Sequence, residues 1–539
     1  MNEITQKNKT KKMAKVNLDA LIPRADFVES KTTPGERPAF DQLNLGHLLE
    51  NSESNFASIY HLIRKPDFQR ETNEWDKKRI LGIIQAWMNK SFVPSIILWQ
   101  NAHTGIIYVI DGAHRLSALL SYINDDYGDR EISHKFYSFN KIPEAEIELA
   151  DDTRKYIEKK LGGSFKEIMK SGGTKADKFK NGRFDVQFVP GDAQVAETSF
   201  FKINQQGVAL NPTEKKLCIG RDLPICLATR IIMKGGGGEQ YWKNFTAENQ
   251  TKASTIATEL HSLIFDPPYK LEAKSAVLHQ PLGGSITNAM PMIYTLLDIL
   301  CTQRQIDGRG KKDSHNGALT CEILDLTRKI IWKTLSEQPG SLGLFPSVYF
   351  YNSGGKYIQS AFLGMIEYLV QNEKNDSSFL PRFIHVRKRM EDFLLKHKVF
   401  ITQINRKFGS KQKSHKQMKG FFMNLIELLH IENDDLQIII KLKEKYNFLN
   451  EIETDIEKSK SYRFSKEVKI AGAIEEELAG ISKCYWCGGH VHPLSKSHDH
   501  EPDVKLGGKS EPKNRKSTHF YCNMSKDKLI EMGIFKREA

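Results

Sequence analysis

The sequence lacks the features of a secreted, disulfide-stapled or membrane-spanning protein. Its 539 residues include only seven cysteines, and no apolar run approaches the length that crosses a bilayer. The first fifteen residues are polar and basic without an apolar stretch, so no secretory signal is visible. A small, odd number of cysteines is typical of a reducing compartment. We therefore expect a cytoplasmic protein that has no membrane partner.

The sequence has fewer acidic than basic residues. The chain has 66 acidic and 79 basic residues and a net charge of +13, which favours a polyanionic partner such as DNA. A hydrophobic content of 39% supports real cores, and the length allows two to four domains. Apolar residues recur at helical spacing in 357–370 and 420–430, so we predict helices in the middle of the chain.

Metal-ligating residue types gather near the C-terminus. Cys484 and Cys487 form a CxxC pair, and His519 and Cys522 form an HxxC pair. Two such pairs predict a four-ligand zinc knot. His519 is preferred as the fourth ligand because its spacing mirrors the first pair, although other histidines lie nearby in the sequence: His490, His492 and His498. A zinc ribbon that only binds a partner would carry the same four residues.

Further polar residues separate this motif from a plain zinc ribbon. Asp499 and His500 follow the first pair, a Gly-Gly turn lies at 507–508, and Asn514 and Asn523 come later. Over roughly residues 481–530 this pattern resembles the HNH (ββα-metal) nuclease family. The resemblance implies Asp499 and Asn523 as ligands of Mg²⁺ or Mn²⁺, His500 as general base and Asn514 as the residue that orients it. It also implies that the four-ligand knot holds a structural Zn²⁺.

The chemistry of phosphodiester cleavage needs these residue types. A divalent cation polarises the phosphate and stabilises the leaving oxygen. Hard cations prefer oxygen ligands, which an aspartate and an asparagine carbonyl supply. A neutral histidine is suited to take a proton from the attacking water.

A second motif lies in the N-terminal half. Strand candidates at 95–99 and 106–110 are followed by Asp111-Gly112 and a helical pattern. A strand, a tight turn and a helix start form an anion site, because free backbone N–H groups and the helix dipole point at one place. Arg115 adds a fork that suits a phosphate. Alternatively, Asp111 merely caps the helix.

These residues resemble the DGQQR-motif domain of the ParB/sulfiredoxin-like superfamily, as found in GmrSD-type restriction systems. A P-x-F-Q-R-x(4)-W segment at 66–75 and the segment 201–210 are also similar, so the resemblance covers roughly 40–225. Ala113 stands where the family has Gln, which leaves open whether the domain hydrolyses a nucleotide or only binds it. The resemblance implies a nucleoside triphosphate site formed by Gln69, Arg70, Asp111, Gly112, His114, Arg115 and Asn204.

Together the motifs predict a multidomain α+β protein. We expect a basic flexible N-terminus at 1–39, a ParB/sulfiredoxin-like sensor at 40–225, a mostly helical connector at 226–470 and a ββα-metal HNH nuclease at 471–539. This combination resembles the GmrSD and SspE type of anti-phage restriction protein and implies a nucleotide-regulated endonuclease that nicks or cuts foreign DNA. Two alternatives stay open: a nucleotide-dependent DNA-binding scaffold and an RNA-cleaving abortive-infection toxin. A homodimer is also left open.

Overall fold

The computed structural model divides the chain into two compact units, which are described separately. The N-terminal unit comprises residues 1–221 and 237–243, and the C-terminal unit comprises 222–236 and 244–539. The residues that the structure describes are 15–25, 27, 40–49, 58–66, 69, 72, 75–136, 142, 144–206, 212–236, 242, 244–265, 289–313, 315–352, 357–409, 414–450, 472, 474, 476, 478–501, 503–504 and 507–536.

The N-terminal unit is built on one mixed sheet of six strands in the order β2-β4-β7-β6-β8-β3. Strands β2, β4 and β7 are parallel, β6 is antiparallel to β7 and parallel to β8, and β3 is antiparallel to β8. The strands are β2 (Arg24–Ala25), β3 (Gln42–Asn44), β4 (Ile63–Pro66), β6 (Ile96–Gln100), β7 (Ile107–Asp111) and β8 (Arg183–Phe188). The strand candidates at 95–99 and 106–110 are thus confirmed as β6 and β7.

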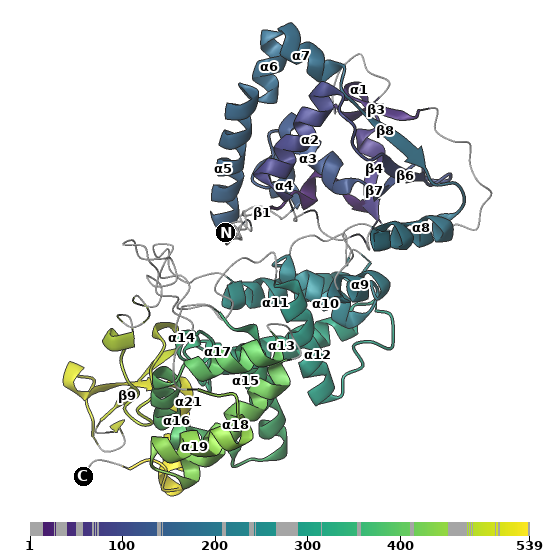
Figure 1. Ribbon diagram of the computed structural model, residues 1–539. Helices are drawn as coiled ribbons and strands as arrows, with labels where there is room; N and C mark the ends of the chain where they lie inside the picture. Colours follow the sequence, from purple (N-terminus) through teal and green to yellow (C-terminus); the bar gives the residue numbers. More distant parts are fainter. Residues whose placement is uncertain are drawn as a thin grey trace, which may run out of the picture. The chain divides into compact units, whose positions relative to one another are not determined.

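Helices cover the sheet and connect its strands (Figure 1). They are α1 (Leu45–Leu48), α2 (Lys77–Asn89), α3 (Ala113–Ile123), α4 (Glu131–Phe136), α5 (Glu144–Leu161), α6 (Phe165–Ser171), α7 (Gly173–Lys180), α8 (Ala193–Gln206) and α9 (Pro212–Ile219). Asp76 caps the N-terminus of α2, because its carboxylate accepts hydrogen bonds from the backbone N–H groups of Lys78 and Arg79.

The period-two pattern of the central strands divides the core of this unit between two faces. Ile107 and Val109 of β7 belong to a cluster with Trp87 of α2 and Leu116 of α3. Tyr108 and its neighbours on the opposite face pack against α8. A strand that is apolar on both faces is buried on both, so its end is held rigidly for the residues that follow it.

The segment 15–25, which the sequence placed in a basic flexible N-terminus, is part of this core. Strand β1 (Lys15–Val16) pairs with β5 (Trp75–Asp76), and η1 (Asp19–Leu21) leads to the edge strand β2. Leu18 and Ile22 are buried. Their burial explains the order, because each removes apolar surface from water at a gain of about 1.5–3 kcal/mol.

The C-terminal unit is mostly helical before residue 450. Its helices are α10 (Pro224–Met233), α11 (Ala247–Phe265), α12 (Met290–Arg304), α13 (Ala318–Leu335), α14 (Pro346–Tyr349), α15 (Gln359–Asn375), α16 (Phe379–Lys396), α17 (Val399–Phe408), α18 (His415–Ile431) and α19 (Asp435–Lys445). The helical pattern at 420–430 lies within α18, and that at 357–370 corresponds to α15, which begins two residues later, at Gln359. These two helices cross closely at Gly364, where a side chain would clash with the backbone of α18. Among the described residues, no helix combines the length and apolar content that a bilayer crossing needs.

The same unit ends in a small strand–strand–helix segment. Its elements are η7 (Pro493–Ser495), β9 (Lys496–His500), η9 (Pro512–Asn514), β10 (Arg515–His519), α21 (Phe520–Met524) and α22 (Lys526–Glu531). Strands β9 and β10 form an antiparallel pair that places Asp499 opposite Lys516 and His500 opposite Arg515. This C-terminal hairpin lies beside α14 and α16 (Figure 1).

Candidate functional site

A three-cysteine, one-histidine cluster lies at the base of the C-terminal hairpin. Cys484, Cys487, His519 and Cys522 place one ligand atom each within 4.8 Å of all the others. His519 Nδ1 is 3.4 Å from Cys487 Sγ and 3.7 Å from Cys522 Sγ. Tetrahedral zinc separates a sulfur and a nitrogen ligand by roughly 3.6 Å, so these residues fit a zinc ion. The structure therefore brings together the four residues that the spacing singled out.

The buried environment of the cluster favours an ion at its centre. Burial raises the pKa of the Cys487 and Cys522 thiols, so thiolates at both positions need a cation between them. The ring N–H at His519 Nε2 donates to the His490 carbonyl over 2.9 Å. This hydrogen bond fixes the tautomer and leaves Nδ1 with a lone pair that faces the sulfurs.

The other histidines considered as fourth ligand are engaged elsewhere. His490 Nδ1 is 2.9 Å from Glu391 Oε2, and the His492 ring packs edge-on against Phe345. His498 lies on β9 opposite Ser517. The hairpin geometry thus selects His519.

Asp499, the expected metal ligand, is buried on β9. Its Oδ2 accepts a hydrogen bond from Trp486 Nε1 over 2.7 Å, and its Oδ1 accepts one from the backbone N–H of His500 over 2.9 Å. The same Oδ1 lies 2.7 Å from the Lys526 ammonium, which also lies 3.0 Å from Asp503 Oδ2. Both carboxylate oxygens of Asp499 therefore have partners, and its role as a metal ligand stays a prediction.

Sequence reasoning missed Lys526 and Asp503. Burial alone would lower the pKa of Lys526, but its hydrogen bonds to the two carboxylates raise it overall. Lysine 526 therefore stays charged beside Asp499. Lys526 reaches Asp499 only because α22 packs against the hairpin, and no local sequence motif predicts that contact.

Asn523 lies on α21, and its side chain contacts the strand that carries Asp499. Its amide nitrogen donates to Ser497 Oγ over 2.9 Å and to the His498 carbonyl over 3.1 Å. Both bonds use the nitrogen, so the carbonyl oxygen is the atom suited to a hard cation. The Asn523 side chain is thus tied to β9, the strand that carries Asp499.

His500 and Asn514 lie at the end of the hairpin where the connecting loop joins the two strands. His500 is partly exposed, and its Nε2 lies 3.3 Å from Ser510 Oγ. Asn514 is buried and donates from Nδ2 to the Lys509 carbonyl over 2.7 Å, while its backbone carbonyl accepts from Glu501 N. These contacts hold Asn514 at the start of β10, across from the end of β9 where His500 lies. Its orienting role stays a prediction.

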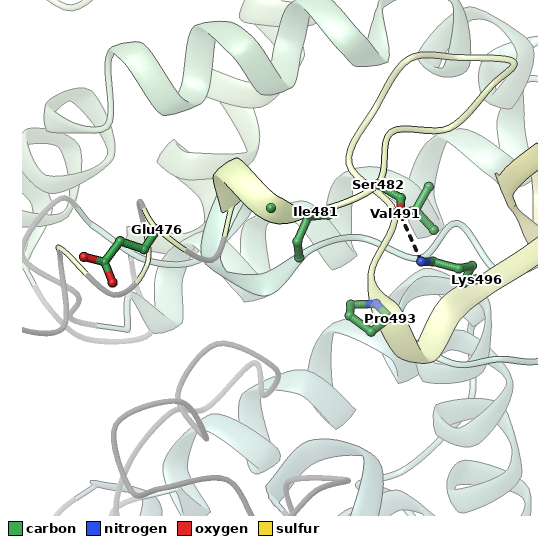
Figure 2. Close-up of a pocket in the computed structure, with 7 residues that line it drawn as sticks. Glu476, Ile481, Ser482, Val491, Pro493 and Lys496 are labelled. Atoms are coloured by element: carbon green, nitrogen blue, oxygen red, sulfur yellow. Dashed lines mark hydrogen bonds between the residues drawn. The ribbon is translucent and has the colours of Figure 1, made fainter.

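A cavity of about 370 Å³ lies beside the hairpin rather than at these residues. In Figure 2 the Lys496 ammonium points toward Ser482, to whose hydroxyl it donates over 3.0 Å. The cavity is lined by Glu476, Gly480, Ile481, Ser482, Val491, Pro493 and Lys496. It includes neither Asp499 nor His500, so this cavity is separate from the candidate catalytic groups.

The second candidate site is at the carboxyl end of β7. Gly112 has a φ of 95°, and an added Cβ would meet the Ile96 backbone at 3.3 Å, so only glycine fits this turn. It is the N-cap of α3 and supplies no side-chain cap. The Asp111 carboxylate instead pairs with Arg115 over 2.8 Å, and Arg115 also donates to the Ser95 carbonyl over 3.1 Å. Asp111 therefore orients Arg115 and is not the cap of the helix.

Of the other residues expected at this site, the structure describes the side chains of His114 and Gln69 but not those of Arg70 and Asn204. The His114 ring lies 5.7 Å from the Trp75 ring. Gln69 is buried, and among the described residues no donor reaches its Oε1. Arg70 lies outside the described residues. Asn204 belongs to α8, but its side chain is outside the described part.

Comparison with known proteins identifies the N-terminal region. Residues 45–218, about a third of the chain, match the family model "GmrSD restriction endonuclease, N-terminal domain". No curated protein and no solved structure matches the chain. A GmrSD N-terminal domain implies a restriction-endonuclease type of anti-phage function, with DNA as the substrate that the family suggests. Residues 45–218 are thus similar to the N-terminal domain of GmrSD restriction endonucleases, and the match supports a GmrSD-type restriction protein.

Proposed function

We propose that the chain is a metal-dependent endonuclease that nicks or cuts foreign DNA and that its GmrSD-type domain gates this activity by binding a nucleoside triphosphate. The observation that carries the proposal is the C-terminal hairpin. It places Asp499 on β9 and Asn523 on α21, whose side chain hydrogen-bonds to β9, directly beside the three-cysteine, one-histidine cluster.

The side chains divide the work as follows. Asp499 and the Asn523 carbonyl would hold a Mg²⁺ or Mn²⁺ ion, which supplies Lewis-acid polarisation of the phosphate. His500 takes the proton of the attacking water, and Asn514 keeps its ring oriented. The zinc cluster ties the two strands to the helix, since a segment this small buries too little apolar surface to be stable alone.

Lys526 has a place in this scheme. Its ammonium and a divalent cation compete for the same Asp499 oxygen. If Asp499 held a divalent ion, the Lys526 ammonium would be available to pair with a DNA phosphate nearby.

The gate is proposed to lie at Gly112 and Arg115. The backbone N–H groups at the start of α3 and the Arg115 guanidinium suit the phosphates of a nucleotide. Its binding changes cleavage only if the nucleotide has different affinities for two arrangements of the chain.

The test is cleavage of supercoiled plasmid with Mg²⁺ or Mn²⁺, with and without each nucleoside triphosphate. Wild type should relax or linearise the plasmid, and His500→Ala should not. His498→Ala, on the same strand, is the matched control and should retain activity. Cleavage of total RNA with no cleavage of plasmid would favour the RNA-toxin alternative. No cleavage of either would favour a DNA-binding scaffold.

A further inference from the structure

Helix α16 buries an ion pair at the edge of the zinc cluster. Arg387 and Glu391 are both fully buried, and Arg387 Nε lies 2.7 Å from Glu391 Oε1. A buried ion pair is often no more stabilising than a hydrophobic pair of similar volume. Its presence is therefore better explained by what the two groups position than by stability.

The remaining hydrogen bonds of the pair reach two other segments. Arg387 donates to the carbonyls of Leu342 and Gly343 over 2.5 and 3.0 Å. Glu391 Oε1 also accepts from the Tyr349 hydroxyl over 2.8 Å. These hydrogen bonds hold Oε1 of Glu391 within the helical region and thereby fix the orientation of the other carboxylate oxygen, Oε2.

That second oxygen binds the C-terminal segment. Glu391 Oε2 accepts from the backbone N–H of His490 over 2.6 Å and lies 2.9 Å from its Nδ1. The His490 carbonyl in turn accepts from His519 Nε2 over 2.9 Å. A continuous chain of hydrogen bonds therefore runs from α16 through one peptide unit to a residue of the zinc cluster.

The fit at this junction is tight. An added Cβ at Gly489 would lie 3.0 Å from Arg387 Nε and 3.1 Å from Glu391 Oε1. The Gly489 carbonyl also accepts from the N–H of Cys484 over 2.8 Å, so the turn of the CxxC pair is packed directly on the ion pair. A second tether is independent of this pair, because the Ser495 hydroxyl donates to the Ser336 carbonyl over 2.5 Å.

We propose that Glu391 and Arg387 are positioning residues for the zinc cluster, so that the helical region builds part of the nuclease and does not merely connect it to the sensor. The inference rests on the proposed zinc site. Glu391 fixes the His490 peptide, and that peptide fixes the tautomer and ring direction of His519. Groups that orient metal ligands in this way typically contribute 10–100-fold in metal affinity.

The experiment measures zinc release from the full-length protein. Wild type, Glu391→Gln and Glu367→Gln are purified, zinc content is determined, and release to a chromogenic chelator is timed below the unfolding temperature of each. Glu367 is the matched control because it is also a largely buried carboxylate, paired with His415 and Lys419 between α15 and α18. We expect about tenfold or faster release from Glu391→Gln and release within about twofold of wild type from Glu367→Gln.

A double variant keeps the proposal falsifiable if Glu391→Gln does not fold. Arg387→Met with Glu391→Met removes both charges and leaves no uncompensated one. It should fold and still release zinc quickly, since His490 has lost its carboxylate partner. Release at the wild-type rate from this variant would overturn the positioning role. Wild-type protein without stoichiometric zinc would overturn the zinc site itself. A normal zinc content with unchanged release from the variants would leave the zinc site standing and overturn only the positioning role.

Discussion

The buried carboxylate of Asp19 should have the largest single effect on the stability of the N-terminal unit. Its Oδ1 lies 2.7 Å from both Arg24 Nη2 and Lys65 Nζ and accepts from the N–H of Thr72 over 3.0 Å. The side chains of all three charged residues are at most 1% exposed. Asp19→Asn keeps the shape and removes the charge, which leaves two buried cations without compensation.

The loss of stability in Asp19→Asn can be estimated from the burial of its charged partners. Removing one partner of a buried ion pair costs about 3–5 kcal/mol, because the remaining charge is desolvated. The matched control is Asp152→Asn. Asp152 pairs with Lys77, but its side chain is 62% exposed, so its loss should cost less than about 1 kcal/mol.

Hydrogen–deuterium exchange of the full-length protein is the assay, because it assigns an opening free energy to each segment. Peptides from 15–25 and 107–123 should lose several kcal/mol of protection in Asp19→Asn and little in Asp152→Asn. Arg24 also donates to the Gln69 carbonyl over 2.7 Å, so nucleotide binding should weaken in the same variant. Equal protection in the two variants would refute the reasoning.

Three further predictions follow from the sites. Arg115→Ala should weaken binding of a fluorescent nucleotide at least tenfold with unchanged zinc content, since its fork faces the Gly112 turn; unchanged binding would place the nucleotide elsewhere. Lys526→Met should tighten Mn²⁺ binding severalfold by paramagnetic resonance, because an ammonium no longer competes at Asp499; a weaker affinity would contradict this. Burial alone would raise the pKa of Glu391, but its interactions with Arg387 and His490 are stronger and lower the pKa to about 2. The stability from this group is therefore complete above about pH 4.5 and is lost as the pH falls toward 2, so Glu391→Gln should flatten acid unfolding in that range.

The sequence predicted the parts of both sites that depend on local spacing. Two residues separate the members of each zinc pair, and a strand, a glycine turn and a helix follow one another at 107–123. Such patterns are set by the chain itself, through the reach of a tight turn and the periods of strand and helix. The candidate ligands and the anion turn could thus be named in advance.

The parts that the sequence did not predict depend on distant contacts. Glu391 meets His490 across 99 positions, and Lys526 reaches Asp499 only after α22 packs on the hairpin. The segment 15–25 was grouped with the polar and basic residues before it, yet β1 pairs with β5 at Trp75–Asp76 and β2 pairs with β4 at Lys65–Pro66. Local propensity carries no information on such pairings, because tertiary burial decides them.

The most direct test of the central claim is magnesium-dependent cleavage of supercoiled plasmid by wild type and His500→Ala at equal zinc content. We predict relaxed or linear plasmid with wild type and intact plasmid with the variant, because the variant keeps its fold and metals but lacks the group that takes the proton. Equal cleavage by both proteins would contradict the assignment of this hairpin as the nuclease site.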